Sequence, residues 1–213
     1  MNTIKKIAVA DDHDIIRYAI KIMLEKNPTR TVIAETNDVT KIVEMCREHQ
    51  PDLLLLDINF QQGDSLNVLK QLKKEFRNSL KILVYSAHEE MKYAFRVLKL
   101  GASGYLTKQE TMQCLGEAID CVLSGKKYIS QVLAQELANR AQDDFEVGEY
   151  EKLSERELQT LELIASGLSV GDIAEKLNLS VKTISMYRSR VLTKLDLRHN
   201  ADLMRYAMDH HLV

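Results

Sequence analysis

The chain has 213 residues, of which 45% are hydrophobic and 28% charged, and its formal net charge is −2. This length suits one large domain or two small ones, and the longest apolar run falls far short of the ~18 residues that a membrane-spanning helix needs. The charge excludes a molecule that is basic throughout, so any contact with nucleic acid must come from a local basic patch.

The N-terminus and the cysteines indicate the compartment. The first residues, MNTIKKIAVADDHD, contain no apolar segment long enough for a signal peptide. The three cysteines, Cys46, Cys114 and Cys121, are odd in number and form no CxxC motif. This pattern favours reduced thiols within the fold and argues against a zinc site. We therefore expect a cytoplasmic protein.

Five short apolar segments alternate with helical patterns over residues 1–125. The helical patterns repeat apolar residues every three or four positions, as in Ile16, Ile20 and Leu24. The apolar segments lack an alternation with polar residues, which is typical of strands buried on both faces of a parallel sheet. This order predicts an open, doubly wound α/β domain that ends near Gly125. The predicted strands are KIAVAD from Lys6, TVIAET from Thr31, DLLLLD from Asp52, KILVYSA from Lys81 and SGYLTK from Ser103.

The remainder of the chain divides into a linker and a helical domain. Residues 126–150 are predicted to be a partly helical linker, because QDDFEVGEYE is acidic and contains a glycine. Residues 151–213 are predicted to form four helices. Ser154 and Glu157 have the spacing of a capping box, Gly167 is placed to end the first helix, and Ser180 is a candidate cap of the third.

Polar residues stand at the ends of four predicted strands, where ligands bind in an open α/β sheet. Asp11 and Asp12 follow the first strand, Asp57 the third, Ser86 ends the fourth and Lys108 follows the fifth. Three carboxylates close together repel, and a hard cation such as Mg²⁺ with oxygen ligands relieves that repulsion. A carboxylate beside Mg²⁺ and a lysine can accept a phosphoryl group as an acyl phosphate. The pattern therefore predicts phosphoryl chemistry at this edge.

These residues resemble the receiver domain of two-component response regulators. The resemblance rests on the doublet Asp11-Asp12, on Asp57, on Ser86 in VYSAH and on Tyr105 and Lys108, and it covers roughly residues 1–125. It implies a flavodoxin-like, five-stranded parallel sheet in which Asp57 accepts a phosphoryl group from a histidine kinase.

The resemblance also implies a metal site. Asp12 and Asp57 are expected to bind Mg²⁺, with the backbone carbonyl of Asn59 as a third ligand and Asp11 just outside the ligand sphere.

Further residues are implied to sense or to limit phosphorylation. Lys108 is expected to pair with the phosphoryl group, Ser86 to move toward it, and Tyr105 to follow inward. Asn59 and His88 occupy positions that tune dephosphorylation in this family.

Three positions depart from the family pattern. Gln61 stands where proline is usual, Ser65 stands where glycine is usual, and Gln109 replaces the proline that often follows the lysine. Many receivers have a cis peptide bond after that lysine, and a cis bond before a non-proline residue costs roughly 3 kcal/mol. The isomer of the Lys108–Gln109 bond is therefore left open, while every residue of the acidic site is present.

The segment VGDIAEKLNLSVKTISMYRSRVLTKL predicts two helices joined by a short turn, a helix-turn-helix. On a helical wheel, Ile184, Tyr187, Val191 and Leu195 share one face and are expected to pack on neighbouring helices. The opposite face carries small polar and basic residues, which suit the major groove of DNA. Residues 181–198 contain five lysines or arginines and one aspartate, which is the local basic patch that the net charge requires.

Residues 152–210 also resemble the LuxR-type helix-turn-helix of the NarL/FixJ response regulators, through LSERE, IASGLS, IAEKLNLS, KTIS and KL. Some relatives have lysine where this chain has Ser185 and Ser189. Serines make fewer bidentate contacts with bases, so DNA shape and bridging water molecules are expected to contribute more to sequence recognition. By position, the residues expected to face bases are Lys182, Ser185, Met186 and Ser189, and those expected to hold phosphates are Thr183, Arg190 and Lys194.

The two resemblances together predict a transcription factor that is controlled by phosphorylation and binds DNA as a homodimer. The receiver is expected to promote only its own phosphorylation and dephosphorylation. One alternative is a constitutive DNA-binding regulator whose receiver does not switch. Another is a phosphohydrolase of the haloacid-dehalogenase type, but such enzymes need a second aspartate where this chain has Asn59. A purely structural interpretation is also possible. In it the acids only form turns at strand ends, and the basic residues are the solvent-exposed face of an ordinary helical bundle.

Overall fold

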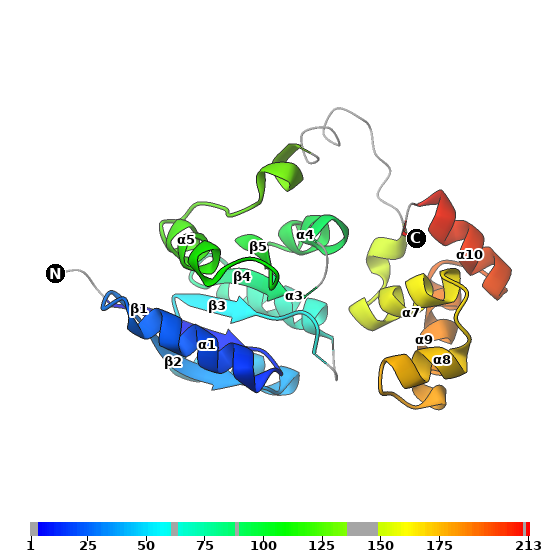
Figure 1. The fold of residues 1–213 in the computed structure, drawn as a ribbon, viewed down its shortest axis with the longest axis horizontal. Coiled ribbons are helices and arrows are strands. Elements are labelled where there is room, and N and C mark those ends of the chain that lie inside the picture. Colours follow the sequence, from blue (N-terminus) through cyan, green and yellow to red (C-terminus); the bar gives the residue numbers. More distant parts are fainter. Residues whose placement is uncertain (1–3, 61–63, 88–89, 136–148, 211) are drawn as a thin grey trace. The chain divides into compact units, whose positions relative to one another are not determined.

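The computed structural model describes residues 4–60, 64–87, 90–135, 149–210 and 212–213. The chain divides into two compact units, Met1–Asp144 and Phe145–Val213, which Figure 1 shows as an α/β unit and a helical unit. Within the described part of the chain, no helix is both long and apolar enough to cross a membrane.

A sheet of five parallel strands forms the centre of the first unit, as predicted. The strand order is β2-β1-β3-β4-β5, so the chain steps outward in one direction after β1 and in the other after β3. Such a reversal places the ends of β1 and β3 at the point where doubly wound folds bind ligands. The strands are β1 (Lys5–Ala10), β2 (Arg30–Thr36), β3 (Leu53–Leu56), β4 (Lys81–Ser86) and β5 (Gly104–Thr107).

Helices cover both faces of this sheet. Figure 1 shows α1 and α5 in front of the sheet, with α3 and α4 behind it. Asp38 caps the short 3₁₀ turn η1 and Asp64 caps α3, each through its side-chain oxygen. The helices are α1 (Asp14–Glu25), η1 (Val39–Lys41), α2 (Ile42–His49), α3 (Ser65–Phe76), α4 (Glu90–Lys99) and α5 (Met112–Leu123).

The four leucines of β3 fix this strand in the core. All four are buried, with at most 1% of each side chain exposed. Because side chains alternate along a strand, Leu53 and Leu55 pack in the cluster that includes α1 and α5, and Leu54 and Leu56 point to the other face. Burial of one such side chain contributes about 1.5–3 kcal/mol, so β3 is firmly held on both sides.

In its described residues the second unit has four helices, as predicted. The capping box forms: the backbone N–H of Ser154 donates to Glu157 at 2.6 Å, and the Ser154 hydroxyl accepts in return. Gly167 ends α7 with a φ of +89°, a conformation that glycine adopts without strain. Ser180 caps α9 by accepting from the Thr183 N–H at 3.0 Å. The helices are α7 (Glu155–Ala165), α8 (Val170–Lys176), α9 (Val181–Lys194) and α10 (Asn200–Asp209), after a 3₁₀ turn η2 (Glu149–Lys152).

The segment after α5 runs beside the edge strand β5. Tyr128 forms an isolated parallel bridge with Gly104, and its backbone bonds to the N–H of Tyr105 and the carbonyl of Ser103 at 3.1 and 3.0 Å. A Cβ on Gly104 would lie 2.6 Å from the Tyr128 carbonyl oxygen, so only glycine permits this approach. Residues 136–148 of the expected linker lie outside the described residues, and the boundaries at 125 and 150 stay predictions.

Cys46 should react with thiol reagents more slowly than the other two cysteines. It is fully buried, and burial raises the pKa of its thiol to about 12, so near pH 8 its thiolate fraction is about a thousandfold below that of an ordinary cysteine. Cys114 and Cys121 are partly exposed. We expect two thiols to react promptly with a disulfide reagent in the native chain, and the third only in denaturant. The prediction would be contradicted if all three thiols reacted equally fast. It would also be contradicted if the slowly reacting thiol were still present in Cys46→Ala.

Candidate functional site

The acidic edge is assembled by the backbone of two neighbouring strands. Ala10 and Leu56 are paired in the sheet, so the residues that follow them, Asp11 and Asp57, leave the sheet side by side. The backbone N–H of Asp57 donates to the Ala10 carbonyl at 2.8 Å. Both acids are buried, Asp57 with 1% of its surface exposed and Asp11 with 2%. The structure thus brings together two acids that are 46 positions apart in the sequence.

Lys108 supplies the counter-charge. Its ammonium Nζ lies 2.6 Å from Oδ2 of Asp57 and 2.7 Å from Oδ2 of Asp11, so one cation bridges the two buried carboxylates. The other oxygen of Asp57, Oδ1, accepts from the backbone N–H of Asn59 at 2.9 Å. Lys108 is positioned by its own backbone N–H, which donates to the Ser86 carbonyl at 2.7 Å.

Burial and charge oppose one another at this edge. Burial raises the pKa of Asp57, and the positive charge of Lys108 offsets only part of that effect. Burial alone would lower the pKa of the Lys108 ammonium, but the carboxylates of Asp57 and Asp11 outweigh it and raise that pKa. The site therefore holds a lysine that stays charged and an aspartate whose charge is costly without a cation.

His13 is a member of this cluster that sequence reasoning missed. Its Nδ1 lies 3.0 Å from Oδ1 of Asp11, 2.8 Å from Oδ1 of Asp12 and 4.0 Å from Oδ2 of Asp57. The only signal in the sequence is its position directly after the doublet Asp11-Asp12. Sequence alone does not show that its ring turns back onto the acids, because that depends on the rotamer and on the start of α1.

The cluster can hold a metal ion. Asp11, Asp12, His13 and Asp57 each offer one ligand atom, and these atoms all lie within 4.8 Å of one another. Three of the four donors are carboxylate oxygens, the type that Mg²⁺ prefers. The donor set therefore fits the ion that the sequence predicts, and Asn59 lies beside it through its bond to Asp57.

The other predicted switch residues occupy β4, β5 and their ends. Ser86 is fully buried and is paired with Thr107 across the sheet. The side chain of Tyr105 is already fully buried in this structure, and its movement on phosphorylation stays a prediction. The described residues contain no cis peptide bond, so the Lys108–Gln109 bond is trans. His88 lies outside the described residues, as does Gln61.

Most of the predicted DNA contacts lie on the exposed face of α9. Ile184 and Val191 are buried and attach α9 to the other helices, and α9 contacts both α7 and α8. The exposed residues recur with the helical period and form one continuous stripe, which contains most of the predicted DNA contacts. These exposed residues are Val181, Lys182, Ser185, Met186, Ser189, Arg190, Thr193 and Lys194.

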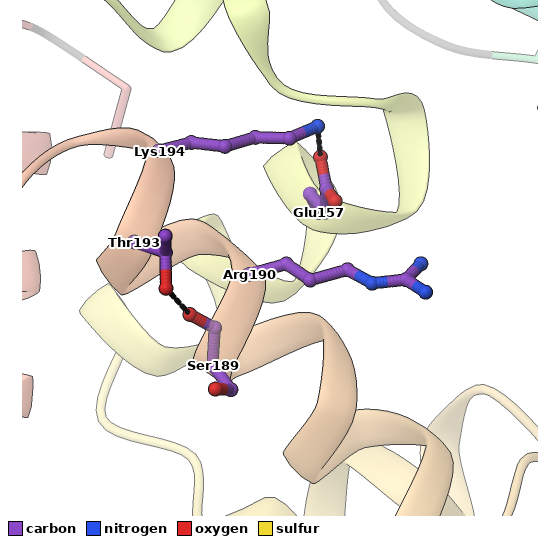
Figure 2. Close-up of a pocket in the computed structure, with 5 residues that line it drawn as sticks. All are labelled: Glu157, Ser189, Arg190, Thr193 and Lys194. Atoms are coloured by element: carbon purple, nitrogen blue, oxygen red, sulfur yellow. Dashed lines mark hydrogen bonds and ion pairs between the residues drawn. The ribbon is translucent and has the colours of Figure 1, made fainter.

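Two of the predicted phosphate contacts have different surroundings. A pocket of about 380 Å³ lies between α7 and α9 and is lined by Glu157, Ser189, Arg190, Thr193 and Lys194. Figure 2 shows Arg190 extended along this pocket with its guanidinium directed away from α9, whereas the side chain of Lys194 reaches Glu157. Arg190 is thus available for a phosphate, and Lys194 is already engaged within the unit.

Lys194 neutralises a buried carboxylate. Its Nζ lies 2.6 Å from Oε2 of Glu157 and 3.3 Å from the carbonyl oxygen of Lys152. Only 3% of the Glu157 side chain is exposed, and the same oxygen accepts from the Ser154 N–H. The sequence prediction assigned Lys194 to DNA phosphates alone. The geometry adds a structural role, because Lys194 ties the end of α9 to the start of α7.

This role predicts a loss of stability when Lys194 is replaced. In Lys194→Met the buried Glu157 carboxylate loses its cation, and we expect the free energy of unfolding of the helical unit to fall by about 1–2 kcal/mol, less than for a fully buried pair because Lys194 is 39% exposed. Hydrogen exchange at the amides of α9 measures this. Lys182→Met, an exposed lysine on the same helix, is the matched control. Adding Glu157→Gln to Lys194→Met should restore part of the loss, and equal exchange in both single variants would contradict the prediction.

A parallel sheet with acids and a bridging lysine at its ligand-binding edge, followed by a helix-turn-helix, defines a receiver joined to a DNA-binding unit. Two family models match the chain: the response regulator receiver domain over residues 7–120, and the luxR family of bacterial regulatory proteins over residues 151–207. The chain belongs to the NarL/FixJ-type response regulators, the two-component transcription regulators that join these two domains.

Relatives match the chain along almost its whole length. It is 34% identical to the oxygen regulatory protein NreC of Staphylococcus haemolyticus over 209 residues, 95% of this chain and 96% of NreC. It is 33% identical to NreC of Staphylococcus aureus over 210 residues, with the same coverage.

Solved structures of RcsB share the fold. RcsB from Salmonella enterica serovar Typhimurium, bound to the promoter rprA in the presence of the phosphomimetic BeF3⁻, aligns with a TM-score of 0.61 at 28% identity, covering 96% of this chain and 98% of RcsB. A structure of two RcsB dimers bound to two parallel DNAs aligns with a TM-score of 0.59 at 27% identity, covering 97% and 98%.

Proposed function

We propose that Asp57 accepts a phosphoryl group from a histidine kinase and that its phosphorylation controls DNA binding by α9. The observation that carries this proposal is the position of Asp57: buried at the carboxyl end of β3, beside Asp11, with Lys108 Nζ at 2.6 Å. A carboxylate that is buried beside a cation in this way has the geometry of a nucleophile. An aspartate that only forms a turn at a strand end would not need this cation.

The chemistry follows from these contacts. A carboxylate oxygen of Asp57 forms a bond to phosphorus while the bond from phosphorus to the donor's histidine nitrogen breaks. The carboxylates of Asp12 and Asp57 and the backbone carbonyl of Asn59 would hold Mg²⁺, with Asp11 just outside; when bound, the ion neutralises charge on the phosphoryl oxygens. Lys108, already 2.6 Å from Oδ2, then pairs with a phosphoryl oxygen in place of the lost carboxylate charge.

The signal leaves the site through β4 and β5. Ser86 and Thr107 are paired across these strands, and Tyr105 lies two residues before Thr107. A hydroxyl drawn toward the phosphoryl group at Ser86, followed by a shift of Tyr105, changes the face made by α4, β5 and α5. His88 and Asn59 are proposed to set the lifetime of the phosphorylated state.

DNA binding is proposed for the exposed stripe of α9. Lys182, Ser185, Met186 and Ser189 face bases, while Thr183, Arg190 and Lys194 lie near phosphates. The RcsB structures with dimers on DNA and with BeF3⁻ at a promoter support a homodimer, in which two copies of α9 read half-sites about one DNA turn apart. We place the protein in the cytoplasm with its DNA.

Two other functions are less well supported. A phosphohydrolase needs an acid two residues after the nucleophile, where this chain has Asn59, so we propose that the receiver turns over only its own phosphoryl group. A constitutive DNA binder needs no phosphoacceptor, and the complete set of Asp57, Asp11 and Lys108 at this edge argues against it.

The test compares DNA affinity in two states. Fragments of genomic DNA selected by the chain are titrated with and without beryllofluoride, which mimics the phosphoryl group. We expect affinity to change by about 5- to 150-fold, the usual size of coupling between two sites, and expect Asp57→Asn to show no change. Equal affinities in both states of the wild type would favour the constitutive binder.

A further inference from the structure

Two large apolar side chains stand in the exposed stripe of α9. Val181, the first residue of the helix, is 55% exposed, and Met186 lies five residues farther along. Met186 is 41% exposed, although the apolar residues Ile184 and Val191 of the same helix are buried. The fold therefore uses those two residues to attach α9 and leaves Met186 outside. Because 41% of Met186 stays exposed, packing within the described unit accounts for only part of its apolar surface.

The neighbours of Met186 on the helix surface are polar. Lys182 lies one turn before it, and Ser189 and Arg190 lie one turn after it, since residues three and four apart share a face. The serine is short, so the thioether projects farther from the helix than Ser189 does. Arg190 directs its guanidinium away from α9 (Figure 2).

The position of Met186 in the helix favours contact with base edges. In a helix-turn-helix, residues in the N-terminal part of the second helix enter the major groove, and Met186 is the sixth residue of α9 (Val181–Lys194). A methionine neither donates a strong hydrogen bond nor carries charge, so it cannot read the polar edges of bases. The apolar feature of the major groove is the C5-methyl group of thymine.

We propose that Met186 selects thymine in the half-site by packing against its C5-methyl group. This rests on the proposed function of α9 in DNA binding. Methionine suits the task because its unbranched side chain adapts to the exact position of the methyl group. With Ser185 and Ser189 making few bidentate contacts, this apolar contact becomes a main source of base selectivity.

The test removes only the methyl group. Fragments selected from genomic DNA by the full chain with beryllofluoride are amplified with dTTP or with dUTP, which gives duplexes that differ in the C5-methyl of thymine. We expect the wild type to bind the uracil duplex about fifteenfold more weakly, because a methyl contact contributes about fourfold in each of the two half-sites. Met186→Ala should bind the thymine duplex more weakly and lose the difference between the two duplexes.

Two further variants separate this contact from general effects. Met208→Ala removes a methionine of α10 that is 58% exposed, and it should keep the wild-type ratio. Met186→Leu keeps an apolar side chain of similar length and should retain most of the difference in affinity between the two duplexes. A wild type that binds both duplexes equally, or a Met186→Ala variant that keeps the wild-type ratio, overturns the proposal while DNA binding stands. If no fragment is enriched, the proposed DNA binding itself fails, and this inference with it.

Discussion

Replacing Asp57 with alanine should abolish formation of an acyl phosphate when the chain is incubated with Mg²⁺ and acetyl phosphate. The reason is positional: Asp57 is the acid at the end of β3, beside Asp11 and 2.6 Å from the cation that would stabilise the product. Intact-mass spectrometry of the labelled chain measures the result.

The control lies at the other end of the same strand. Asp52 precedes β3 and accepts from the backbone N–H of Lys6 at 2.8 Å, so Asp52→Ala removes an acid from the opposite edge of the sheet. This variant should be labelled as the wild type is. Labelling that persists in Asp57→Ala would show that another residue is the acceptor.

The second large effect concerns Lys108. In Lys108→Met, Asp57 and Asp11 lose the cation that bridges them, and breaking a buried pair in this way destabilises by about 3–5 kcal/mol. We expect a fall of about 3 kcal/mol in the free energy of unfolding of the receiver unit at neutral pH. Urea denaturation followed by circular dichroism measures it. Lys74→Met, an exposed lysine of α3, is the control and should change the free energy little.

The pH dependence of this variant has a definite sign. Burial already raises the pKa of Asp57 and the lysine offsets part of that rise, so without the lysine the pKa rises further. A carboxyl group whose folded-state pKa is raised stabilises the fold below its unfolded-state pKa, and that stability is lost as the pH rises through the folded-state pKa. The deficit of Lys108→Met should therefore shrink on acidification. A deficit that is constant or grows at acidic pH would contradict this explanation.

The sheet and the acidic edge could be predicted because they depend on local pattern and topology. Runs such as LLLL indicate a buried parallel strand, and parallel strands bring their carboxyl ends to one edge, so Asp11 and Asp57 could be placed together from their positions alone. Helix ends such as Ser154 and Gly167 were likewise predicted, because caps depend on a few adjacent residues.

Contacts between distant side chains could not be predicted in this way. The pairing of Lys194 with Glu157 joins residues 37 positions apart and depends on the angle between α7 and α9, which no local pattern encodes. The turn of His13 onto the acids depends on its rotamer. In both cases a polar side chain has a partner that is buried or partly buried.

The close approach of Tyr128 to Gly104 has a consequence for solubility. An edge strand with unpaired backbone groups is a template on which another chain can add a strand, and such pairing leads to aggregation. Here the carbonyl of Ser103 and the N–H of Tyr105 are taken by Tyr128 of the same chain. Any side chain at position 104 would push this cover away, since its Cβ would lie 2.6 Å from the Tyr128 oxygen. Gly104 therefore protects the sheet from growing beyond its fifth strand.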